Sequence, residues 1–394
     1  ELKTVLLPAW DCLPYDRVSP NGEVVGLRVR SLARLVTKTK ADRLILTTVN
    51  ALLQRVPPRE FFIGAGMGLQ VGDQVELEEL LAMFTRSGYG RTDTVREAGE
   101  YAVRGGIIDV YPTGFEEPVR LDFFGDELES IRRFDPMSQR TSGKSKKVIF
   151  RPTGELLLDD ASVQRFRQGY RGLFGAEVTS DPVYDAVSAG RRHGGMEHWL
   201  PLFHERMATV FDYATDAVIA LDHQAEEATT NRFEQIHEYH TARADMLKVS
   251  GSEAGGIYRP LPADALYLGE AELATLLSDR VVGAFTPFAS PDGPAVIDCG
   301  AKGGVDLTEA RTRGGTEIYQ AAADAVGLEA GKAKVIVAGY STGSRDRLAH
   351  LLGEHGLKSI VAVDNLEEAK ALPKGATAAL VLPVEHGFRF EGLS

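Results

Sequence analysis

The chain has 394 residues, more than one hydrophobic core usually organises, and its 43% apolar and 25% charged residues are typical of a modular globular protein. Its formal charge of −12 would repel a phosphate backbone, so the composition favours a protein partner over nucleic acid. The only cysteines, Cys12 and Cys299, exclude a disulfide framework and a cysteine-rich zinc site, and we expect both to be core residues.

No apolar run reaches the roughly 18 residues that cross a bilayer, and residues 1–20 lack the basic, apolar and small-residue order of a signal peptide. We therefore expect a cytoplasmic protein with no membrane partner. The sequence has no initiator Met and runs from Glu1 directly into the apolar residues 4–7, as if a strand were already under way. We expect it to be part of a longer protein.

The first segment, residues 1–67, has the alternating pattern of an α/β layer. Residues 22–37 place apolar side chains three and four apart with arginines between them, which predicts an amphipathic helix. Residues 44–49 predict a strand of the buried parallel kind, and a further helix should extend to Gln54. Pro57-Pro58 should end this regular structure, because neither residue can donate a backbone hydrogen bond.

Residues 68–150 have a different rhythm, with short apolar stretches separated by glycine and aspartate turns. Gly125-Asp126 lies between two strand-like runs and predicts a hairpin. We interpret this region as an inserted, mainly β domain. Its exit, residues 141–147, is polar and basic, which favours a solvated linker, with nucleic-acid contact by the lysines as the alternative.

Beyond residue 150 the α/β pattern returns, and we take 151–308 as the second segment of the first domain. Residues 218–222 predict a buried strand, 224–247 a long helix, and 251–256 a glycine-bearing loop. Residues 309–394 predict a small α/β domain of unknown role. Its expected helices are 315–328, 344–354 and 366–371, and its expected strands are 335–338, 359–363 and 378–382.

Two glycine clusters are candidate nucleotide sites. The phosphate cradle of an ATPase, G-x-x-x-x-G-K-[ST], does not occur in the sequence. The glycines of residues 64–68 lack a following helix signal and a ribose-binding acid, so we interpret them as a domain-entry loop. Residues 339–343 lie between a strand and a helix, where an anion can bind. Most such turns bind nothing, and a nucleotide-dependent enzyme using this loop stays open as an alternative.

Catalytic and metal-binding patterns are lacking. His237 and His240 stand at i and i+3, whereas the metalloprotease helix needs i and i+4, so an exposed helix face is the favoured interpretation. No serine occupies a nucleophile-elbow sequence, and no His and Asp are spaced as a triad. We expect no catalytic residue, no cofactor and no metal.

Residues 120–124, Arg-Leu-Asp-Phe-Phe, form the most informative stretch. Strand side chains alternate between faces, so Arg120, Asp122 and Phe124 should share one face. Leu121 and Phe123 should then take the opposite, buried face. An exposed aromatic residue beside an arginine is the composition of a protein-binding hot spot.

Residues 100–112 supply two more strand runs, broken by Gly105-Gly106. These glycines permit a bulge or a close backbone approach and would present Arg104 outward. The alternative is that the arginines only pair with acids on a solvated sheet, and the pattern alone slightly favours it. The candidate acids are Asp122, Glu116 and Glu127.

Three ordered stretches, residues 87–89, 99–112 and 120–135, closely resemble the second domain shared by UvrB and the transcription-repair coupling factor (Mfd) family. Four further stretches are similar to Mfd and extend the resemblance over nearly the whole chain: residues 7–20, 138–141, 197–203 and 385–388. The middle of the chain, about 225–330, matches only loosely.

The resemblance implies a first domain of degenerate RecA/helicase-like fold in two sequence segments, which has lost its nucleotide-binding apparatus in this family. The sequence starts after the point where that motif would stand, so its loss is inferred from the family. The full-length protein would be an ATP-dependent DNA translocase. It would bind RNA polymerase and double-stranded DNA only through regions absent from this sequence.

The resemblance also implies that the inserted domain is the surface that the repair protein UvrA recognises, through two arginines and a phenylalanine. By motif these fall on Arg104, Arg120 and Phe124. Arginines bind carboxylates in a bidentate manner, and phenylalanine fills apolar pockets. In the full-length protein the C-terminal domain would cover the same face and cause autoinhibition. The alternative, UvrB itself, would need a phosphate cradle and a tyrosine-rich hairpin that we do not find.

Overall fold

The computed structural model describes residues 3–37, 39, 41–64, 66–175, 178, 181–250, 258–288, 290–291, 293–315 and 317–390. The loop expected at 251–256 lies outside these residues. Internal contacts divide the chain into two compact units, Glu1–Pro287 (the N-terminal unit) and Phe288–Ser394 (the C-terminal unit). Across the described ranges, no helix has both the length and the apolar composition needed to span a membrane.

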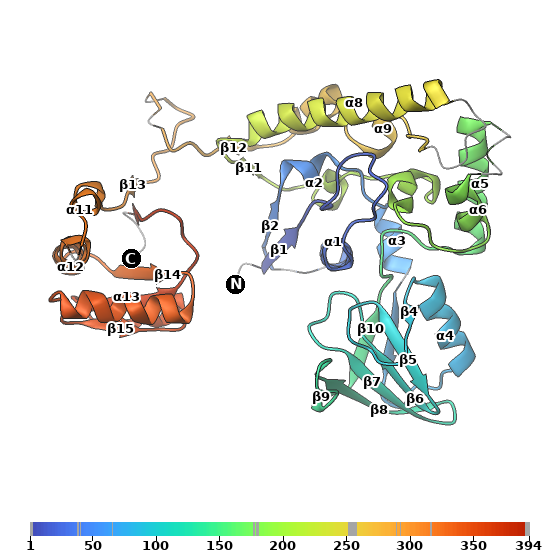
Figure 1. The fold of residues 1–394 in the computed structure, drawn as a ribbon, viewed down its shortest axis with the longest axis horizontal. Coiled ribbons are helices and arrows are strands. Elements are labelled where there is room, and N and C mark those ends of the chain that lie inside the picture. Colours follow the sequence, from blue (N-terminus) through green and yellow to red (C-terminus); the bar gives the residue numbers. More distant parts are fainter. Residues whose placement is uncertain are drawn as a thin grey trace. The chain divides into compact units, whose positions relative to one another are not determined.

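The N-terminal unit contains an α/β part interrupted by residues 67–150, which have a sheet and an apolar core of their own and which we call the inserted domain (Figure 1). The α/β part comprises β1 (Lys3–Leu7), α1 (Gly22–Val36), β2 (Arg43–Thr47), α2 (Val49–Leu53), α3 (Arg59–Gly64), α5 (Asp160–Phe174), α6 (Pro182–Ser188), the 3₁₀ helix η2 (Met196–Leu202), α7 (Val210–Tyr213), β11 (Ile219–Leu221), α8 (Ala225–Ser250), α9 (Ala263–Leu266), α10 (Glu270–Ser278) and β12 (Val282–Ala284). The inserted domain comprises β3 (Met67–Gln70), α4 (Leu77–Arg86), β4 (Gly90–Arg91), β5 (Glu100–Arg104), β6 (Ile107–Val110), β7 (Val119–Phe124), β8 (Glu127–Phe134), β9 (Thr141–Ser145) and β10 (Lys147–Phe150).

Helix α1 confirms the helix expected at 22–37. Asn21 caps it by accepting a hydrogen bond from the backbone N–H of Glu23, and its apolar stripe, with Val29 and Leu32 fully buried, packs against β1. Strands β1 and β2 pair in parallel, as expected. The expected burial of the second strand is wrong for one face, where Leu44 and Leu46 are exposed, because α1 covers only the other face.

The two segments of the α/β part form one packing unit across the insertion. Arg28 of α1 is fully buried and its Nε lies 2.5 Å from a carboxylate oxygen of Glu155, which follows the inserted domain. The indole N–H of Trp10 donates to the same carboxylate at 3.1 Å. Backbone bridges between Val56 and Ala208 tie the segments together further along the chain.

The chain enters and leaves the inserted domain through adjacent strands. Helix α3 ends at Gly64, β3 begins at Met67, and β3 pairs antiparallel with β10, so that Met67 lies opposite Phe150. Of residues 64–68, which were expected to form a domain-entry loop, Gly64 ends α3, Met67 and Gly68 belong to β3, and Ala65 lies outside the described residues, so the expected loop is wrong for three of its five residues.

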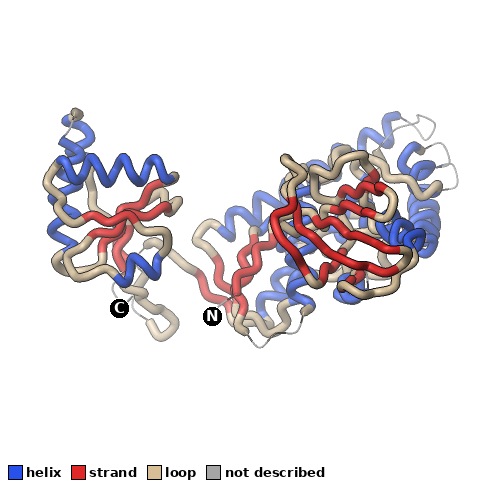
Figure 2. Tube along the Cα trace, turned by 90° about the horizontal axis from the view of Figure 1, so that it is seen from below, coloured by secondary structure: helices blue, strands red, loops and turns tan. Residues whose placement is uncertain are grey.

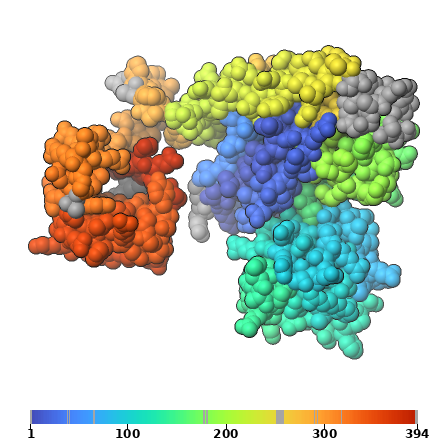
Figure 3. All heavy atoms as spheres, in the orientation of Figure 1, coloured from blue at the N-terminus to red at the C-terminus, as the bar shows by residue number. Residues whose placement is uncertain are grey.

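The inserted domain is built on a 6-stranded sheet of order β4-β5-β6-β7-β8-β9, in which the β4–β5 pair is parallel and the other pairs are antiparallel. Strands are drawn in red in Figure 2. Helix α4 packs on one face, where its Phe84 and the β7 residue Leu121 are fully buried in a shared apolar core. Each such side chain contributes roughly 1.5–3 kcal/mol on burial. The domain forms a compact body, drawn in cyan to green in Figure 3.

Residues 141–147 are not a linker, and that expectation is wrong. Residues Thr141–Ser145 form β9, which pairs with β8 and places Ser145 opposite Ile131. Edge strands carry polar and basic residues because one side of their backbone faces water. Composition alone therefore did not separate this strand from a solvated connection.

Helix α8 confirms the helix expected at 224–247. The strand expected at 218–222 is present as β11, paired in parallel with β12. Its expected burial is wrong: Val218 is 72% exposed and Ala220 is exposed as well. An apolar run in the sequence predicts a strand, but it does not predict whether other elements cover the faces of that strand.

The C-terminal unit confirms the three helices and three strands expected between 315 and 382. Its elements are β13 (Ala301–Gly303), α11 (Thr308–Arg313), α12 (Glu317–Ala330), β14 (Val335–Gly339), α13 (Thr342–Glu354), β15 (Ile360–Ala362), α14 (Leu366–Ala371), β16 (Thr377–Val381) and β17 (Phe388–Phe390). A parallel sheet has the order β14-β16-β15, and β13 pairs antiparallel with β17. The domain boundary expected at 308/309 stays a prediction.

Mixed helices and small sheets in both units confirm an α/β multidomain fold. The RecA/helicase-like character of the α/β part stays a prediction. Of the two cysteines expected in cores, Cys12 is partly buried against the largest apolar cluster, whereas Cys299 is exposed and that expectation is wrong.

Candidate protein-binding site

Two hairpin turns of the inserted domain lie at the same end of its sheet, which we call the tip. Strand β5 ends at Arg104 before the turn Gly105-Gly106, and β7 ends at Phe124 before the turn at Gly125. The backbone N–H at Phe123 donates to the carbonyl of Gly106 at 2.8 Å. This hydrogen bond and the antiparallel order bring both turns, and the residues that precede them, to one edge of the domain.

Glycine is required at one position of the tip for reasons of space. A Cβ added to Gly106 would lie 2.7 Å from the carbonyl oxygen of Phe123, a backbone atom that cannot move aside easily. Gly105 has a φ of 62° and open space around it. The close backbone approach expected at this glycine pair is therefore confirmed.

The face of the sheet opposite α4, which we call the polar face, carries the expected side chains. Leu121 is fully buried on the core side and Phe123 packs against the same core, whereas Phe124 is 77% exposed. The expected alternation along β7 is confirmed. Register places Asp109, Arg120 and Arg132 side by side on three adjacent strands of this face.

Arg120 is held by an acid that sequence reasoning missed. Its Nε and Nη2 donate to the two carboxylate oxygens of Asp109 at 2.6 and 2.8 Å, and its guanidinium lies 4.9 Å from the ring centroid of Phe134. The Asp109 side chain is 2% exposed and that of Arg120 is 19% exposed. Donating these hydrogen bonds to the Asp109 carboxylate raises the pKa of Arg120. Arg120 is thus an oriented cation, with Nη1 making no hydrogen bond to any residue that the structure describes.

A second ion pair lies beside the first. Arg132 donates from Nε and Nη2 to Asp122 at 2.9 and 2.7 Å, and the Ser130 hydroxyl donates to the same carboxylate. Burial alone would raise the pKa of Asp122, but the hydrogen bonds from Arg132 and Ser130 lower it overall. Asp122 therefore stays charged, and its charge is neutralised within the sheet.

Arg104 differs from both paired arginines. Its Nη2 donates to the backbone carbonyl of Asp93 at 2.7 Å and lies 3.4 Å from the Thr94 hydroxyl. No carboxylate pairs with it among the described residues. The proposed pairing of the arginines with sheet acids thus holds for Arg120, through Asp109 and not through the three acids expected, and does not hold for Arg104.

The sequence contained one signal for Asp109. It stands between Ile108 and Val110, both fully buried, so a lone carboxylate in an apolar strand requires a partner nearby. The partner can be identified only from the register of β6 against β7, which places Asp109 opposite Arg120.

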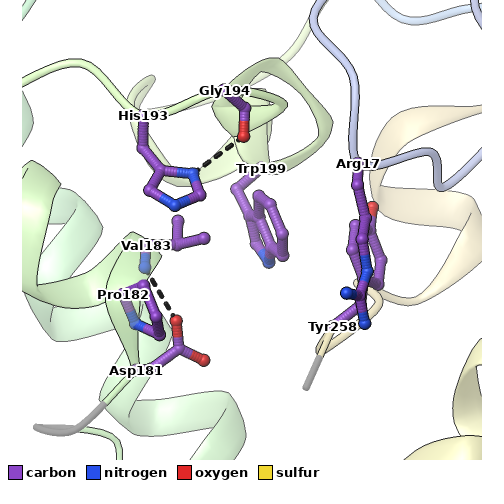
Figure 4. Close-up of a pocket in the computed structure, with 8 residues that line it drawn as sticks. All are labelled: Arg17, Asp181, Pro182, Val183, His193, Gly194, Trp199 and Tyr258. Atoms are coloured by element: carbon purple, nitrogen blue, oxygen red, sulfur yellow. Dashed lines mark hydrogen bonds between the residues drawn. The ribbon is translucent and has the colours of Figure 1, made fainter. Parts of the chain in front are cut away.

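A pocket of about 210 Å³ lies elsewhere in the N-terminal unit (Figure 4), lined by Arg17, Asp181, Pro182, Val183, His193, Gly194, Trp199 and Tyr258. The carboxylate in this pocket, that of Asp181, already accepts hydrogen bonds from within the protein. Asp181 accepts from the backbone N–H of Val183 at the start of α6, and from the Tyr170 hydroxyl and Arg259. We assign this pocket no chemistry.

Cys12 and His198 approach each other in the core, with Sγ 3.9 Å from Nε2, a contact that the sequence did not predict. Burial raises the pKa of the Cys12 thiol to about 12 and lowers the pKa of His198 to about 4. At neutral pH both groups are uncharged, so the thiolate that a cysteine nucleophile requires does not form.

At the turn of residues 339–343, one backbone N–H that could bind an anion is already hydrogen-bonded within the chain. The Ser341 hydroxyl accepts from the backbone N–H of Ser344, and a Cβ on Gly339 would lie 2.6 Å from the backbone N of Arg345.

Within the described residues, His, Cys, Asp and Glu side chains do not gather in a group able to hold a metal. On α8, His237 is exposed as expected, whereas His240 is partly buried and its ring packs against Tyr15.

Comparison with known proteins gives the inserted domain a family. Residues 67–156 match the UvrB interaction domain. Over 232 residues, 58% of this chain, it is 35% identical to a transcription-repair-coupling factor of Haemophilus influenzae, covering 20% of that relative. It is 34% identical to that of Escherichia coli (69% of this chain, 23% of the relative) and 30% identical to that of Mycobacterium bovis (71% and 24%).

The resemblance expected from the sequence is therefore confirmed: the chain carries a UvrB interaction domain and is homologous to transcription-repair-coupling factors. The chain spans between 20% and 24% of the length of the relatives named above.

Proposed function

From this homology, we propose that the chain is a non-catalytic docking module that binds UvrA through the inserted domain. The observation that carries the proposal is the tip of a UvrB interaction domain that presents an unpaired arginine, Arg104, and a 77% exposed phenylalanine, Phe124. Exposed aromatic and arginine side chains of this kind dominate the energetics of protein interfaces.

The three candidate residues have different roles in this proposal. Phe124 enters an apolar pocket of the partner, and Arg104 pairs with a partner carboxylate through its free guanidinium donors. Arg120 is already oriented by Asp109 and offers its remaining donors in a fixed direction. Pre-organisation of this kind reduces the side-chain entropy lost on binding.

The wider role follows from the relatives. In a full-length transcription-repair coupling factor, this module would bring UvrA to stalled RNA polymerase in transcription-coupled nucleotide excision repair. ATP-driven translocation on double-stranded DNA and polymerase binding would belong to regions outside this sequence. The C-terminal domain of the same protein would cover the polar face and cause autoinhibition. The relatives named above are all transcription-repair-coupling factors, which favours this role over the alternative, a UvrB-type damage-verification subunit.

The proposed domain limits accompany this function. Residues 1–67 and 151–308 would form one RecA/helicase-like domain, and residues 68–150 the UvrA-binding insertion. Residues 309–394 would form a small α/β domain of unknown role.

Binding of purified UvrA to the immobilised chain tests the proposal. We expect Arg104→Ala and Phe124→Ala each to weaken binding about tenfold to a hundredfold, equivalent to about 1–3 kcal/mol. Matched controls on the same domain are Arg133→Ala, whose side chain is 51% exposed on β8, and Met137→Ala, which is 83% exposed. Circular dichroism of each variant checks that its fold is intact.

The outcomes separate clearly. If the tip variants bind UvrA more weakly and the control variants do not, the result supports docking at the tip. Equal affinity for all variants moves the site elsewhere, and a wild-type chain that does not bind UvrA overturns the proposed function.

A further inference from the structure

A fourth side chain lies within the exposed tip. Ile107 begins β6 directly after the Gly105-Gly106 turn, is paired across the sheet with Arg104 on one side and Asp122 on the other, and is 37% exposed. Side chains of directly paired residues lie on the same face, about 4.5–5.5 Å apart at Cβ. Ile107 is therefore on the polar face, beside Arg104.

Ile107 and Phe124 are also neighbours. Phe124 stands two residues beyond Asp122, the partner of Ile107, so the two apolar side chains are diagonal neighbours on adjacent strands. Such pairs lie roughly 7–8 Å apart, within reach of an aromatic ring. Ile107 thus lies between Arg104 and Phe124.

Among the described residues, Ile107 is not packed into the core of the inserted domain. Its chain neighbour Ile108 is fully buried in the domain core, whereas Ile107 belongs to none of the apolar clusters found among the described residues. The turns beside the tip are bare, because a Cβ added to Gly105 or Gly125 would meet nothing within 4 Å. A partner surface can therefore reach Ile107 and Phe124 together.

We propose that Ile107 is a direct contact residue for the docking partner and joins Arg104 and Phe124 into one continuous patch. The inference rests on the proposed function and commits to UvrA as the occupant. The matching surface of UvrA would be an apolar hollow, wide enough for an aromatic and an aliphatic side chain, with a carboxylate at its rim opposite Arg104. The neighbouring Asp122 does not repel that carboxylate strongly, because Arg132 neutralises it.

The test measures UvrA binding by the whole chain with Ile107→Ala and with Ile107→Thr, which keeps the β-branched shape that the strand favours. The matched control is Ile149→Ala, an isoleucine of β10 in the same domain that is 41% exposed. We expect both Ile107 variants to weaken binding about threefold to tenfold, with Ile149→Ala unchanged. The loss should come from faster dissociation, because an apolar contact acts after the charged encounter.

Phe124→Ala, measured in parallel, separates this inference from the proposed function. If Phe124→Ala weakens binding and neither Ile107 variant does, the inference is wrong and the docking proposal stands. If Ile149→Ala weakens binding as much as Ile107→Ala, the inference is also wrong, because position at the tip would not matter. If the wild type binds and none of these variants changes affinity, both assignments are wrong.

Discussion

Two arginine–carboxylate pairs in the N-terminal unit share their chemistry and differ in surroundings. Arg28 and Glu155 join the two segments of the α/β part, and their side chains are 0% and 2% exposed. Arg120 and Asp109 lie on the polar face of the inserted domain, with the arginine 19% exposed. The first pair has no surface left for a partner and serves the fold, whereas the second leaves one edge of its guanidinium open to the surface.

The largest expected effect concerns the fully buried pair. Glu155→Ala would leave the Arg28 guanidinium without a counter-charge in the core, where its remaining hydrogen bond goes to the Pro8 carbonyl. We expect a loss of about 3–5 kcal/mol in the free energy of unfolding of the α/β part. Denaturant unfolding followed by tryptophan fluorescence measures it, since the two tryptophans of the chain, Trp10 and Trp199, lie in one core of this part.

The exposed pair Glu60 and Arg206 provides the control, with side chains 69% and 63% exposed. Glu60→Ala should change the free energy of unfolding by less than about 1 kcal/mol. Equal losses for Glu60→Ala and Glu155→Ala would contradict the role assigned to the buried pair.

The second prediction compares how the two regions respond to acid. Burial lowers the pKa of His198 to about 4 in the folded chain, against 6.5 for an unperturbed histidine. Between these values the unfolded chain binds a proton that the folded chain does not, so stability is full above about pH 6.5 and falls toward pH 4. From pH 7 to pH 5 we expect the α/β part to lose on the order of 2 kcal/mol through His198, and the partly buried His204, whose pKa is also lowered, acts in the same direction.

His198→Gln should reduce this pH dependence, whereas His237→Gln, on the exposed face of α8, should not. The polar face should respond differently, because the lowered pKa of Asp122 keeps its pair with Arg132 charged at pH 5. Stability that falls equally in the wild type and in His198→Gln would overturn the assignment.

The third prediction separates Arg120 from Arg104. Arg120→Ala removes the partner of a carboxylate that is 2% exposed, so we expect it to destabilise the inserted domain by about 1–3 kcal/mol. Arg104→Ala removes only hydrogen bonds to Asp93 and Thr94 at an exposed position. It should change the free energy of unfolding of the inserted domain by no more than about 0.5 kcal/mol. Hydrogen exchange of peptides from residues 100–134 reports on this domain, which contains no tryptophan.

Both arginine variants should weaken UvrA binding, but only Arg120→Ala should speed hydrogen exchange. A further comparison asks whether Asp109 acts through Arg120. Asp109→Asn should weaken binding in the wild-type background and have no added effect in Arg120→Ala. Additive losses would show that Asp109 contacts UvrA independently.

Local pattern predicted most elements and part of the site. The alternation along β7 correctly placed Leu121 in the core and Phe124 at the surface, because a strand has a fixed period of two. The turn at Gly125-Asp126 was equally predictable, since Gly125 has a φ of 61° that favours glycine.

Register and coverage were not predictable from one sequence. The pairing of Asp109 with Arg120 depends on how β6 aligns with β7, and the contact of Cys12 with His198 joins residues 186 positions apart. The exposure of Leu44 depends on which face of a strand other elements cover. These properties arise from tertiary packing, which an apolar run or a motif does not encode.

The smallest expected effect on stability is that of Phe124→Ala, and Phe123→Ala provides the comparison. Phe124→Ala should change the unfolding free energy of the inserted domain by less than about 0.5 kcal/mol, because its ring, 77% exposed, lies outside the domain's core cluster. Phe123→Ala, one residue earlier on the core face, should cost about 2–3 kcal/mol. Hydrogen exchange of residues 100–134 distinguishes the two variants. If Phe124→Ala destabilised the domain as much as Phe123→Ala, its ring would serve the fold in place of a partner, and the reason for assigning Phe124 to the docking surface would disappear.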